Sequence, residues 1–352
     1  MILFILIILI IVLIAAVLYY YAFRYEPVNF GLSKVNIFLR DAEKNKIKEK
    51  GKDNHAVKDN SNPVLTFLHL SDFHLRKNSK GKKLFKFVRN LIKLNVDFIF
   101  ITGDLTENDK NIEYLIKMLS PLEAKYGKYA VFGVHDHYSK TLVEFIKNMF
   151  KRKRRYKREN DVTYMAKRLK DIGIEVLRNE SRRINTGSYD MGDIEIIGLD
   201  DPIINKIDIA KAFSHISTIV DNRPELPEKS DYKNIYKNIF RLKEEKIHKI
   251  NNRGKLRIAL MHTPDNDSII NLARKKVDII LSGHTHGGQI RLPLVGAIVS
   301  GCKIKTKFAS GLFYFKKFVL YVTRGLGEGK YSQFRFYCQP EASLVRIYKI
   351  DE

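Results

Sequence analysis

Cysteine, glycine and proline are all scarce in this chain of 352 residues. Its two cysteines, Cys302 and Cys338, cannot form a disulfide framework, and neither belongs to a CxxC pair of the kind that binds zinc or carries redox chemistry. We expect both to be buried thiols. With 20 glycines and 9 prolines, the chain is neither fibrous nor dominated by linkers. A hydrophobic content of 45% is enough for a folded core and excludes a wholly disordered protein.

Charge is absent from residues 2–23 (ILFILIILIIVLIAAVLYYYAF). A helix over this stretch would be about 33 Å long, enough to cross the hydrocarbon core of a bilayer. The alternative is a cleaved signal peptide, but that needs a basic start and a shorter apolar core with a small-residue cleavage site. The three consecutive tyrosines 19–21 are typical of an interfacial aromatic belt. We therefore predict an uncleaved transmembrane anchor over residues 1–23.

Residues 24–62 are predicted to form a polar linker, with the fewest apolar residues between Arg40 and Asn62. Residues 24–60 hold nine Lys/Arg and six Asp/Glu, whereas the flank before the apolar run has none. The positive-inside rule then favours a single-pass protein of the cell membrane whose body lies in the cytoplasm, although only Arg24 and Lys34 lie close to the span.

The basic surplus of the chain, 63 Lys+Arg against 39 Asp+Glu for a net charge of +24, is unevenly distributed. Residues 147–158 carry eight Lys/Arg and no acid, within a basic amphipathic segment over residues 140–160. Its apolar residues recur at helical spacing: Leu142, Phe145, Ile146, Met149 and Phe150. Docking on an anionic membrane surface and an ordinary solvated helix face both fit this pattern. Nucleic acid is disfavoured as a partner, because no helix-turn-helix, zinc-finger or RNA-recognition sequence is present.

From Val64 onward, short apolar runs alternate with helical patterns, and each run ends in polar and glycine residues. This is typical of buried strands in an α/β sheet, which present ligand-binding residues at their carboxyl ends. Histidine and aspartate recur at those ends in SDFHL, TGDLTEN, GVHDHY, LMHTPD and SGHTHGG, which contain six of the ten histidines. An isolated Asp-x-His or His-x-His is usually a satisfied polar turn. Five such blocks, each closing an apolar strand, predict a divalent-metal site.

The order of these blocks resembles the signature of the calcineurin-like metallophosphoesterases. The blocks are Asp72-x-His74, Gly103-Asp104, Gly133-x-His135-Asp136, His262 and Gly283-His284-x-His286. GHTHGGQIRLP and the closing RGLG and RFYCQPE resemble the membrane-associated bacterial branch, which includes UDP-2,3-diacylglucosamine pyrophosphatases. The resemblance covers residues 63–352 and implies an α/β class fold, a four-layer α/β/β/α sandwich, here preceded by one transmembrane helix.

The resemblance also implies two divalent ions, Mn, Fe or Zn, that share Asp104. The first would be held by Asp72, His74, Asp104 and His286, and the second by Asp104, His262 and His284. His135 would act as the general acid at the leaving-group oxygen, while Asp136 would orient its imidazole. Arg324 in TRGLG is a candidate for substrate phosphate binding, with a structural ion pair as the alternative.

One position departs from the family pattern. Where the family has asparagine in Gly-Asn-His-Asp, this chain has Val134, which cannot bind an ion. The second metal site could then be weaker, His137 or another group could substitute, or activity could be lost. The remaining blocks favour a membrane-anchored phosphodiesterase or pyrophosphatase with a lipid-linked or nucleotide-sugar-lipid substrate. The alternative is a catalytically weakened or inactive metal-binding membrane protein, because Val134 replaces the asparagine of the second metal. The sequence gives no information on the oligomeric state.

Overall fold

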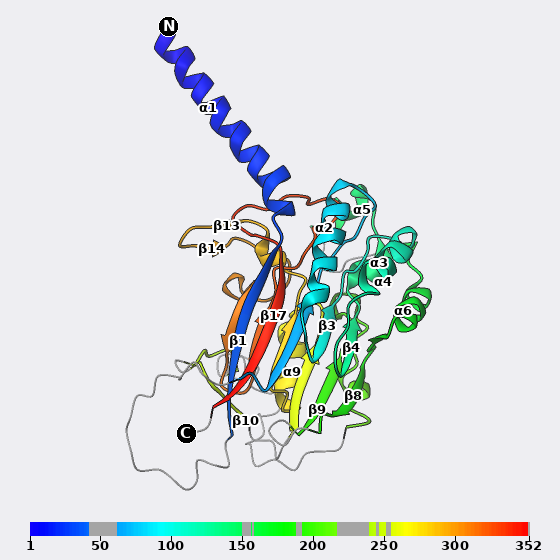
Figure 1. The fold of residues 1–352 in the computed structure, drawn as a ribbon. Helices are drawn as coiled ribbons and strands as arrows, with labels where there is room; N and C mark the ends of the chain where they lie inside the picture. Colours follow the sequence, from blue (N-terminus) through cyan, green and yellow to red (C-terminus); the bar gives the residue numbers. More distant parts are fainter. Residues whose placement is uncertain are drawn as a thin grey trace, which may run out of the picture.

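The computed structural model of the protein describes residues 1–41, 62–149, 156, 158–187, 192–216, 239–243, 246–250 and 255–350. An apolar helix, α1 (Ile2–Tyr20), projects from a body built on two β-sheets (Figure 1). Much of the predicted basic cluster, residues 150–155 and 157, lies outside the described residues. The part of that segment before it forms helix α5 (Leu142–Met149), on which Leu142, Val143 and Ile146 are exposed.

The first sheet contains seven strands among the described residues, in the order β10-β1-β17-β2-β3-β4-β7. In chain order these are β1 (Gly31–Asp41), β2 (Leu65–Leu70), β3 (Phe98–Thr102), β4 (Gly127–Val131), β7 (Ile174–Val176), β10 (His248–Ile250) and β17 (Glu341–Ile350). Strands β2, β3, β4 and β7 run parallel to one another, whereas β17 is antiparallel to β2. Strands β1 and β17, from the two ends of the described chain, pair in parallel between β10 and β2.

The second sheet contains six described strands in the order β15-β16-β12-β11-β9-β8. They are β8 (Glu180–Asn185), β9 (Asp193–Gly198), β11 (Lys255–Leu260), β12 (Ile279–Ser282), β15 (Gly311–Tyr314) and β16 (Val319–Val322). Two short pairs complete the described strands: β5 (Tyr138–Ser139) with β6 (Arg158–Glu159), and β13 (Arg291–Leu292) with β14 (Gly296–Ala297).

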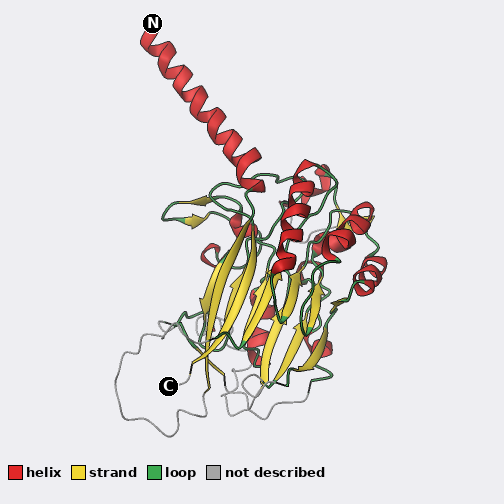
Figure 2. Cartoon of the chain, in the orientation of Figure 1, coloured by secondary structure: helices red, strands yellow, loops and turns green. Residues whose placement is uncertain are grey.

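The two sheets pack face to face through a continuous apolar layer, in which Phe67 and Phe100 of the first sheet meet Ile258 and Leu281 of the second. Helices α2 (Ser79–Asn90), α3 (Ile112–Leu119) and α6 (Val162–Asp171) bury apolar faces on the outer side of the first sheet. Helices α7 (Ile209–Ala212) and α9 (Asn266–Arg274) do the same on the second (Figure 2). The four-layer α/β/β/α arrangement expected from the sequence is confirmed.

The helices begin where polar side chains cap their first turns. The side chain of Asn78 accepts a hydrogen bond from the backbone N–H of Gly81 at 2.9 Å, and that of Asp265 accepts one from Ser268 at 3.1 Å. The remaining short helices are η1 (Tyr21–Tyr25), η2 (Glu26–Val28), η4 (Leu91–Lys93), η5 (Asp109–Asn111), α4 (Val134–His137), η6 (Pro202–Ile204), η8 (His286–Gly288) and η9 (Thr306–Phe308).

Strand β1 corrects the predicted domain boundary, because it lies inside the segment 24–62 that we interpreted as a linker. Its residues pair with β17 from Gly31 to Arg40, and Ile37 and Leu39 are almost fully buried between the sheets. Alternating apolar residues in a strand all face one side of the sheet. The polar residues before Ile37 and after Leu39 lowered the average hydrophobicity of the segment and hid this pattern. Residues 42–61, the rest of the predicted linker, lie outside the described chain.

The register of the first sheet places the base of α1 at the carboxyl ends of β2, β3 and β4. Gly31 lies opposite Glu341 on β17, and Ser343 lies opposite His69 on β2. The start of β1, three residues after the last helical turn, is therefore level with the end of β2. Since parallel strands end at one edge of the sheet, any ligands carried at those ends lie on the side of the molecule from which α1 projects (Figure 1).

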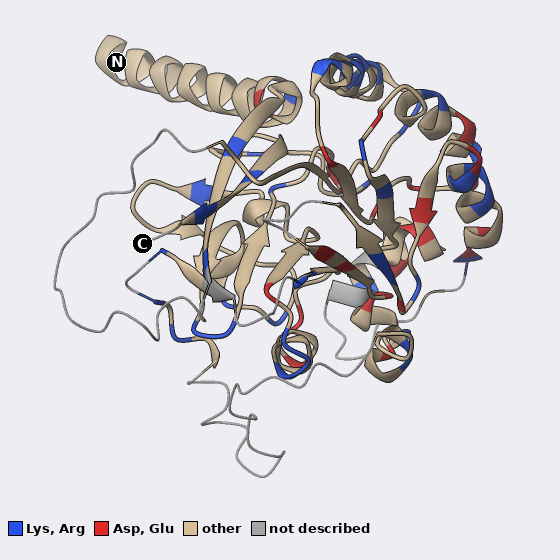
Figure 3. Ribbon diagram, turned by 60° about the horizontal axis from the view of Figure 1, so that its bottom comes forward, with Lys and Arg blue, Asp and Glu red and all other residues tan. Residues whose placement is uncertain are grey.

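Helix α1 is long and apolar enough to cross a membrane, with a mean hydropathy of 3.6 and no buried residue in its most apolar window. Along this helix, residues of the types Lys, Arg, Asp and Glu first occur at its base, as the ribbon colours of Figure 3 show. Its last turns continue into η1 and η2, where Tyr21 and Phe23 contact the rings of Phe336 and Phe334. The apolar helix is thus attached directly to the folded body rather than through a polar tether.

If β1 is an integral strand, the substitution Ile37→Ala should destabilise the body by about 2–5 kcal/mol, because it leaves a cavity between the sheets. The exposed neighbour Asn36 provides the matched control, and Asn36→Ala should change the free energy of unfolding by about 0.5 kcal/mol or less. Urea unfolding of the full-length protein in detergent measures both. Equal, small effects of the two substitutions would contradict the assignment.

Candidate metal centre

The candidate ligands lie just beyond the strand ends, in backbone conformations that side chains rarely adopt. Asp72, His74, Asp104, His284 and His286 have φ values of 53°, 41°, 52°, 67° and 48°. Each non-glycine residue in this region costs about 1–3 kcal/mol, and such strain persists mainly at functional sites. Strand β2 ends at Leu70, so Asp72 and His74 lie beyond the strand, and left-handed turns aim both side chains.

Three of the predicted ligands converge in a first cluster, because atoms of Asp72, His74 and His286 lie within 4.8 Å of one another. The Nε2 atom of His286 is 3.5 Å from Oδ1 of Asp72 and 3.2 Å from Nε2 of His74. Glycine at position 325, with φ of 66°, is needed beside this cluster, since a Cβ there would lie 2.7 Å from the Cβ of Asp72.

A second cluster contains Asp104, His262 and His284, with ligand atoms again within 4.8 Å. The Nε2 atom of His262 is 3.1 Å from Oδ2 of Asp104 and 3.3 Å from Nδ1 of His284. The same Oδ2 atom lies 3.5 Å from Nε2 of His74 in the first cluster. The Asp104 carboxylate therefore lies between the two clusters, where a bridging ligand would be required.

In His262 and His286, the hydrogen bond made by Nδ1 indicates that Nε2, which faces the cluster, carries a lone pair. The Nδ1 atom of His286 is 3.0 Å from the carbonyl oxygen of Gly327, and that of His262 is 2.7 Å from the carbonyl oxygen of Thr102. A carbonyl oxygen only accepts, so each Nδ1 carries the proton and each Nε2 faces the cluster unprotonated in the neutral ring. Lone pairs aimed at carboxylates and at one another fit a shared cation, and mixed N and O donors suit Mn, Fe or Zn.

Glu107 is a functional candidate that our sequence reasoning missed. Its buried carboxylate lies 3.0 Å from Nδ1 of His74 and 3.4 Å from Nδ1 of His135, and it accepts the backbone N–H of Lys330 at 2.8 Å. Burial raises the pKa of Glu107, but His135 and His74 outweigh it and hold that pKa well below its ordinary value. The signal in the sequence was an acid three residues after Asp104, in TGDLTEN.

Asp136 occupies a different position from the one we expected. Its carboxylate accepts hydrogen bonds from the backbone N–H groups of Asp104 (2.8 Å), Leu105 (2.7 Å) and Gly133 (2.9 Å). Burial, followed by the charge of Asp104, raises the pKa of Asp136 to about 7. Asp136 therefore joins the two loops that carry the site, and the carboxylate that faces the His135 imidazole is Glu107.

His135 lies at the edge of the clusters, with its side chain 16% exposed and therefore within reach of a ligand. Its backbone N–H donates to Oδ1 of Asp104 at 2.8 Å, and the Nζ atom of Lys140 lies 3.1 Å from its Nε2. Burial, followed by the charge of Lys140, lowers the pKa of His135. Lys140 is a second contact that the sequence patterns did not indicate.

Val134 lines the pocket and is 1% exposed at the start of α4. His137 does not replace the missing amide, since its Nε2 lies 3.6 Å from Asp200 and its Nδ1 lies 3.4 Å from Lys206, away from both clusters. Of the consequences that the sequence left open, substitution by His137 therefore has no geometric support.

Arg324 forms a structural ion pair, which was the alternative to phosphate binding in the sequence analysis. Its guanidinium forms an ion pair with Glu341 and lies 3.3 Å from the hydroxyl of Ser33, and its backbone N–H donates to Glu341 at 3.0 Å. These contacts join the Arg324 loop to β17 and β1. The side chain is not part of the pocket lining, so the geometry gives no support to phosphate binding by Arg324.

The metal clusters open into a pocket of about 200 Å³. Its other walls come from residues 284–289, 299–301 and 329–332, and two cationic side chains, Lys140 and Lys330, line it. Burial raises the pKa of Asp104, but His262 and His135 outweigh it and hold the pKa well below its ordinary value. A cationic rim around an acidic, imidazole-rich floor is suited to an anionic substrate held against metal ions.

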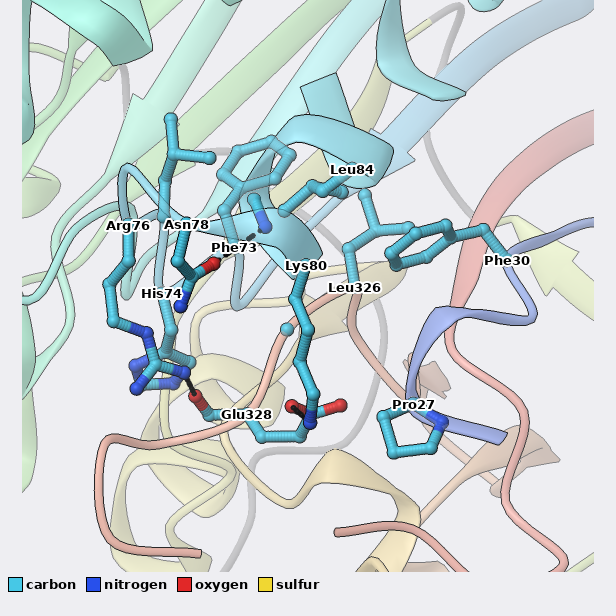
Figure 4. A pocket seen from close by; sticks show the side chains of 13 residues that line it. Pro27, Phe30, Phe73, His74, Arg76, Asn78, Lys80, Leu84, Leu326 and Glu328 are labelled. Carbon is cyan, nitrogen blue, oxygen red and sulfur yellow. Dashed lines mark hydrogen bonds and ion pairs between the residues drawn. The ribbon is translucent and has the colours of Figure 1, made fainter. Parts of the chain in front are cut away.

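A second, smaller pocket of about 20 Å³ lies between the site and the base of α1, and Figure 4 shows its lining. Here Arg76 donates to the carbonyl oxygen of Glu328 at 2.9 Å, while Nζ of Lys80 contacts the Glu328 carboxylate at 3.4 Å. Pro27 and Phe30, directly after the apolar helix, form the opposite side. These contacts fix residues 327–338, hereafter the wall segment, between α2 and the base of α1.

Two packed sheets that deliver carboxylates and imidazoles to one edge define a metal-dependent phosphoester hydrolase. The chain belongs to the calcineurin-like phosphoesterase family, whose pattern it matches over residues 65–288. It is 28% identical over 302 residues to the uncharacterized metallophosphoesterase YkoQ of Bacillus subtilis, covering 84% of this chain and 87% of the relative. It is 27% identical over 313 residues to the UDP-2,3-diacylglucosamine pyrophosphatase LpxG of Chlamydia trachomatis, covering 80% and 83%. It is 25% identical over 292 residues to the phosphodiesterase YaeI of Escherichia coli, covering 82% and 84%.

Replacing Glu107 by glutamine should reduce metal affinity or kcat/KM by about 10–100-fold, as loss of a carboxylate behind a ligating histidine does. The measurement is hydrolysis of a chromogenic phosphodiester across a manganese titration. Glu113→Gln, on the exposed face of α3, is the matched control and should behave as the unsubstituted protein. Unchanged metal dependence in Glu107→Gln would exclude this role.

Restoring the family amide in Val134→Asn should increase the occupancy of the second metal, because an amide oxygen at the pocket wall adds a ligand that valine lacks. Metal content per chain, measured by elemental analysis after dialysis against a fixed manganese concentration, tests this. If stoichiometry and rate are both unchanged, the valine does not limit the second site.

Proposed function

We propose that the protein is a membrane-anchored, metal-dependent phosphodiesterase or pyrophosphatase that acts on a lipid-linked substrate. One observation carries the proposal: the ligand clusters lie at the end of the molecule from which the apolar helix projects. The backbone N–H of Cys338 donates to the Glu26 carboxylate at 2.9 Å, and its thiol lies 3.2 Å from the carbonyl oxygen of His286. A single residue thus links the base of the apolar helix to a metal-ligand loop.

In this proposal the two clusters hold two divalent ions, with Asp104 shared. The ligands of the first are Asp72, His74, Asp104 and His286, and those of the second are Asp104, His262 and His284. Ions bound there would supply Lewis acidity and lower the pKa of a water molecule that attacks phosphorus. Val134 leaves the second ion with fewer protein ligands than the family pattern provides.

The residues around the clusters position the substrate and move the proton. Lys140 and Lys330 offset the charge of the phosphoryl oxygens at the pocket rim. His135 gives a proton to the leaving-group oxygen. Glu107 on Nδ1 holds the ring in place, and Lys140 lies beside the Nε2 atom that faces the pocket. Asp136 fixes the loop backbone on which this arrangement depends.

The substrate class follows from the anchor and from the relatives. A lipid-linked phosphodiester or pyrophosphate remains in the bilayer, so its enzyme must act at the membrane surface. The similarity to LpxG supports a nucleotide-sugar lipid as one member of this class. The excess of Lys/Arg after the apolar helix supports a cytoplasmic site. Protease protection in sealed vesicles of known orientation tests the sidedness.

The activity test uses the full-length protein in detergent with added manganese and a chromogenic phosphodiester. Asp104→Asn should lose at least about a hundredfold in kcat/KM, since it removes the shared ligand's charge. A metal-replete protein that hydrolyses no phosphoester tested, and whose behaviour His135→Ala does not change, would instead support the alternative of an inactive metal-binding membrane protein.

Removing residues 2–18 should separate chemistry from membrane location. This truncation retains Tyr21, Ala22 and Glu26, which contact the wall segment. We expect hydrolysis of a soluble chromogenic diester within about twofold of the full chain. Turnover of a lipid-linked diester in vesicles should fall about tenfold or more, because the local substrate concentration is lost. Equal losses on both substrates would contradict anchoring as the reason for lipid turnover.

A further inference from the structure

The β13–β14 hairpin and the residues directly after it expose an apolar surface that the body does not bury. Five of its large apolar side chains are exposed by 40% or more: Leu292, Leu294, Val295, Ile298 and Val299. Leu294, at the tip, is fully exposed, and Val295 is 71% exposed. Contiguous apolar patches of this kind mark surfaces that contact a protein or a membrane.

Leu294 also has a backbone conformation that is unfavourable for leucine. Its φ of 64° lies in the left-handed region, where glycine or asparagine is more stable than leucine. At this position the chain therefore carries a residue that is unfavourable for the turn and unfavourable in water. Both costs would be offset if the side chain entered an apolar environment.

The hairpin is bonded to the wall segment, which in turn contacts the base of α1. The backbone of Phe336 accepts from Arg291 at 2.9 Å and donates to Gln289 at 2.8 Å. Its ring packs edge-on against Tyr21 with centroids 5.6 Å apart. In the preceding residue, the backbone N–H of Arg335 donates to the carbonyl oxygen of Ala22 at 2.9 Å. The hairpin is thus held beside the last turns of the apolar helix (Figure 1).

The charge of this region favours a lipid surface over another apolar partner. Residues 291–307 contain four Lys/Arg and no acidic residue. Basic residues that follow an apolar tip are attracted to anionic headgroups while the tip enters the hydrocarbon boundary. Tyr337, 63% exposed on the wall segment, adds an aromatic side chain of the type found at the membrane interface.

We infer that the β13–β14 hairpin inserts its tip into the lipid bilayer beside α1 and holds the mouth of the metal pocket at the membrane surface. This inference rests on the proposed membrane anchoring. The same loop forms the pocket wall, because Gln289 and Val299 at the two ends of the hairpin line the pocket. A lipid-linked phosphoester can then reach the clusters without leaving the bilayer surface.

The absence of tryptophan from the chain gives a direct test. Single tryptophans are introduced in the full-length protein, reconstituted in phosphatidylglycerol-containing vesicles, and their fluorescence is measured with and without lipids brominated on the acyl chains. Leu294→Trp reports on the tip. Leu9→Trp, in α1, reports on anchoring. Ile92→Trp is the control, since this residue is 43% exposed in η4, just before β3 and at the opposite end of that strand from the metal clusters.

We expect brominated lipids to quench Leu9→Trp and Leu294→Trp at least about twofold more than Ile92→Trp, because bromine quenches only at short range within the bilayer. Quenching of Leu9→Trp alone would overturn the inference and leave the anchoring intact. If Leu9→Trp is not quenched, the anchoring proposal itself fails. A blue-shifted but unquenched Leu294→Trp would indicate that a second copy or another protein covers the tip, and would also overturn the inference.

The variant Leu294→Asn separates a membrane role from a structural one. Asparagine suits the left-handed turn, so the thermal unfolding temperature should be unchanged or higher. Turnover of a lipid-linked diester in vesicles should nevertheless fall about fivefold to tenfold, while hydrolysis of a soluble diester stays the same. Unchanged vesicle turnover in Leu294→Asn would contradict a role for the hairpin at the membrane.

Discussion

The structure depends on a cluster of buried carboxylates and imidazoles. These groups are held within a few ångströms of one another, although they repel or desolvate each other. Asp72 and Asp104 are both carboxylates with almost no exposure, and the imidazole nitrogens around them present lone pairs to the same space. Without a cation such a cluster is costly, because buried charge and unpaired lone pairs lose their hydration. Left-handed turns at five of the six ligands add strain that ordinary folding would remove. A cation bound at the two candidate clusters would offset these costs.

The supporting contacts are arranged so that the cluster cannot relax. The Asp136 carboxylate accepts hydrogen bonds from backbone amides of two separate loops. Carbonyl oxygens accept hydrogen bonds from the Nδ1 atoms of His262 and His286. Glycines stand where any side chain would strike a ligand: a Cβ at Gly133 would lie 2.3 Å from Oδ1 of Asp104. The loops are therefore rigid because of close packing and backbone hydrogen bonds, and the preorganised ligand atoms need little rearrangement to hold an ion.

The sequence allowed the fold class to be predicted, because apolar strands alternate with helical patterns. Each candidate ligand follows an apolar strand, and the structure brings these residues together in two clusters. It did not reveal β1, since Ile37 and Leu39 lie in a segment whose average composition, dominated by the polar residues that follow, resembles a linker. The assignment of Asp136 to His135 failed for a different reason: sequence adjacency says nothing about where a carboxylate points in a tight turn. Glu107 reaches His135 from another loop, and only the three-dimensional arrangement shows that contact. Cys338 was correctly expected to be buried, whereas Cys302 is only half-buried.

The topology explains why the apolar helix and the candidate metal centre occur at the same end of the molecule. Because β1 runs parallel to β17, and β17 runs antiparallel to β2, a helix placed before β1 must lie near the carboxyl end of β2. The candidate metal ligands lie at the same edge, where α/β sheets generally bind their ligands. Had β1 been a flexible linker, the pocket could have faced any direction relative to the apolar helix. As an integral strand, β1 fixes the orientation of the pocket and of the wall segment relative to that helix.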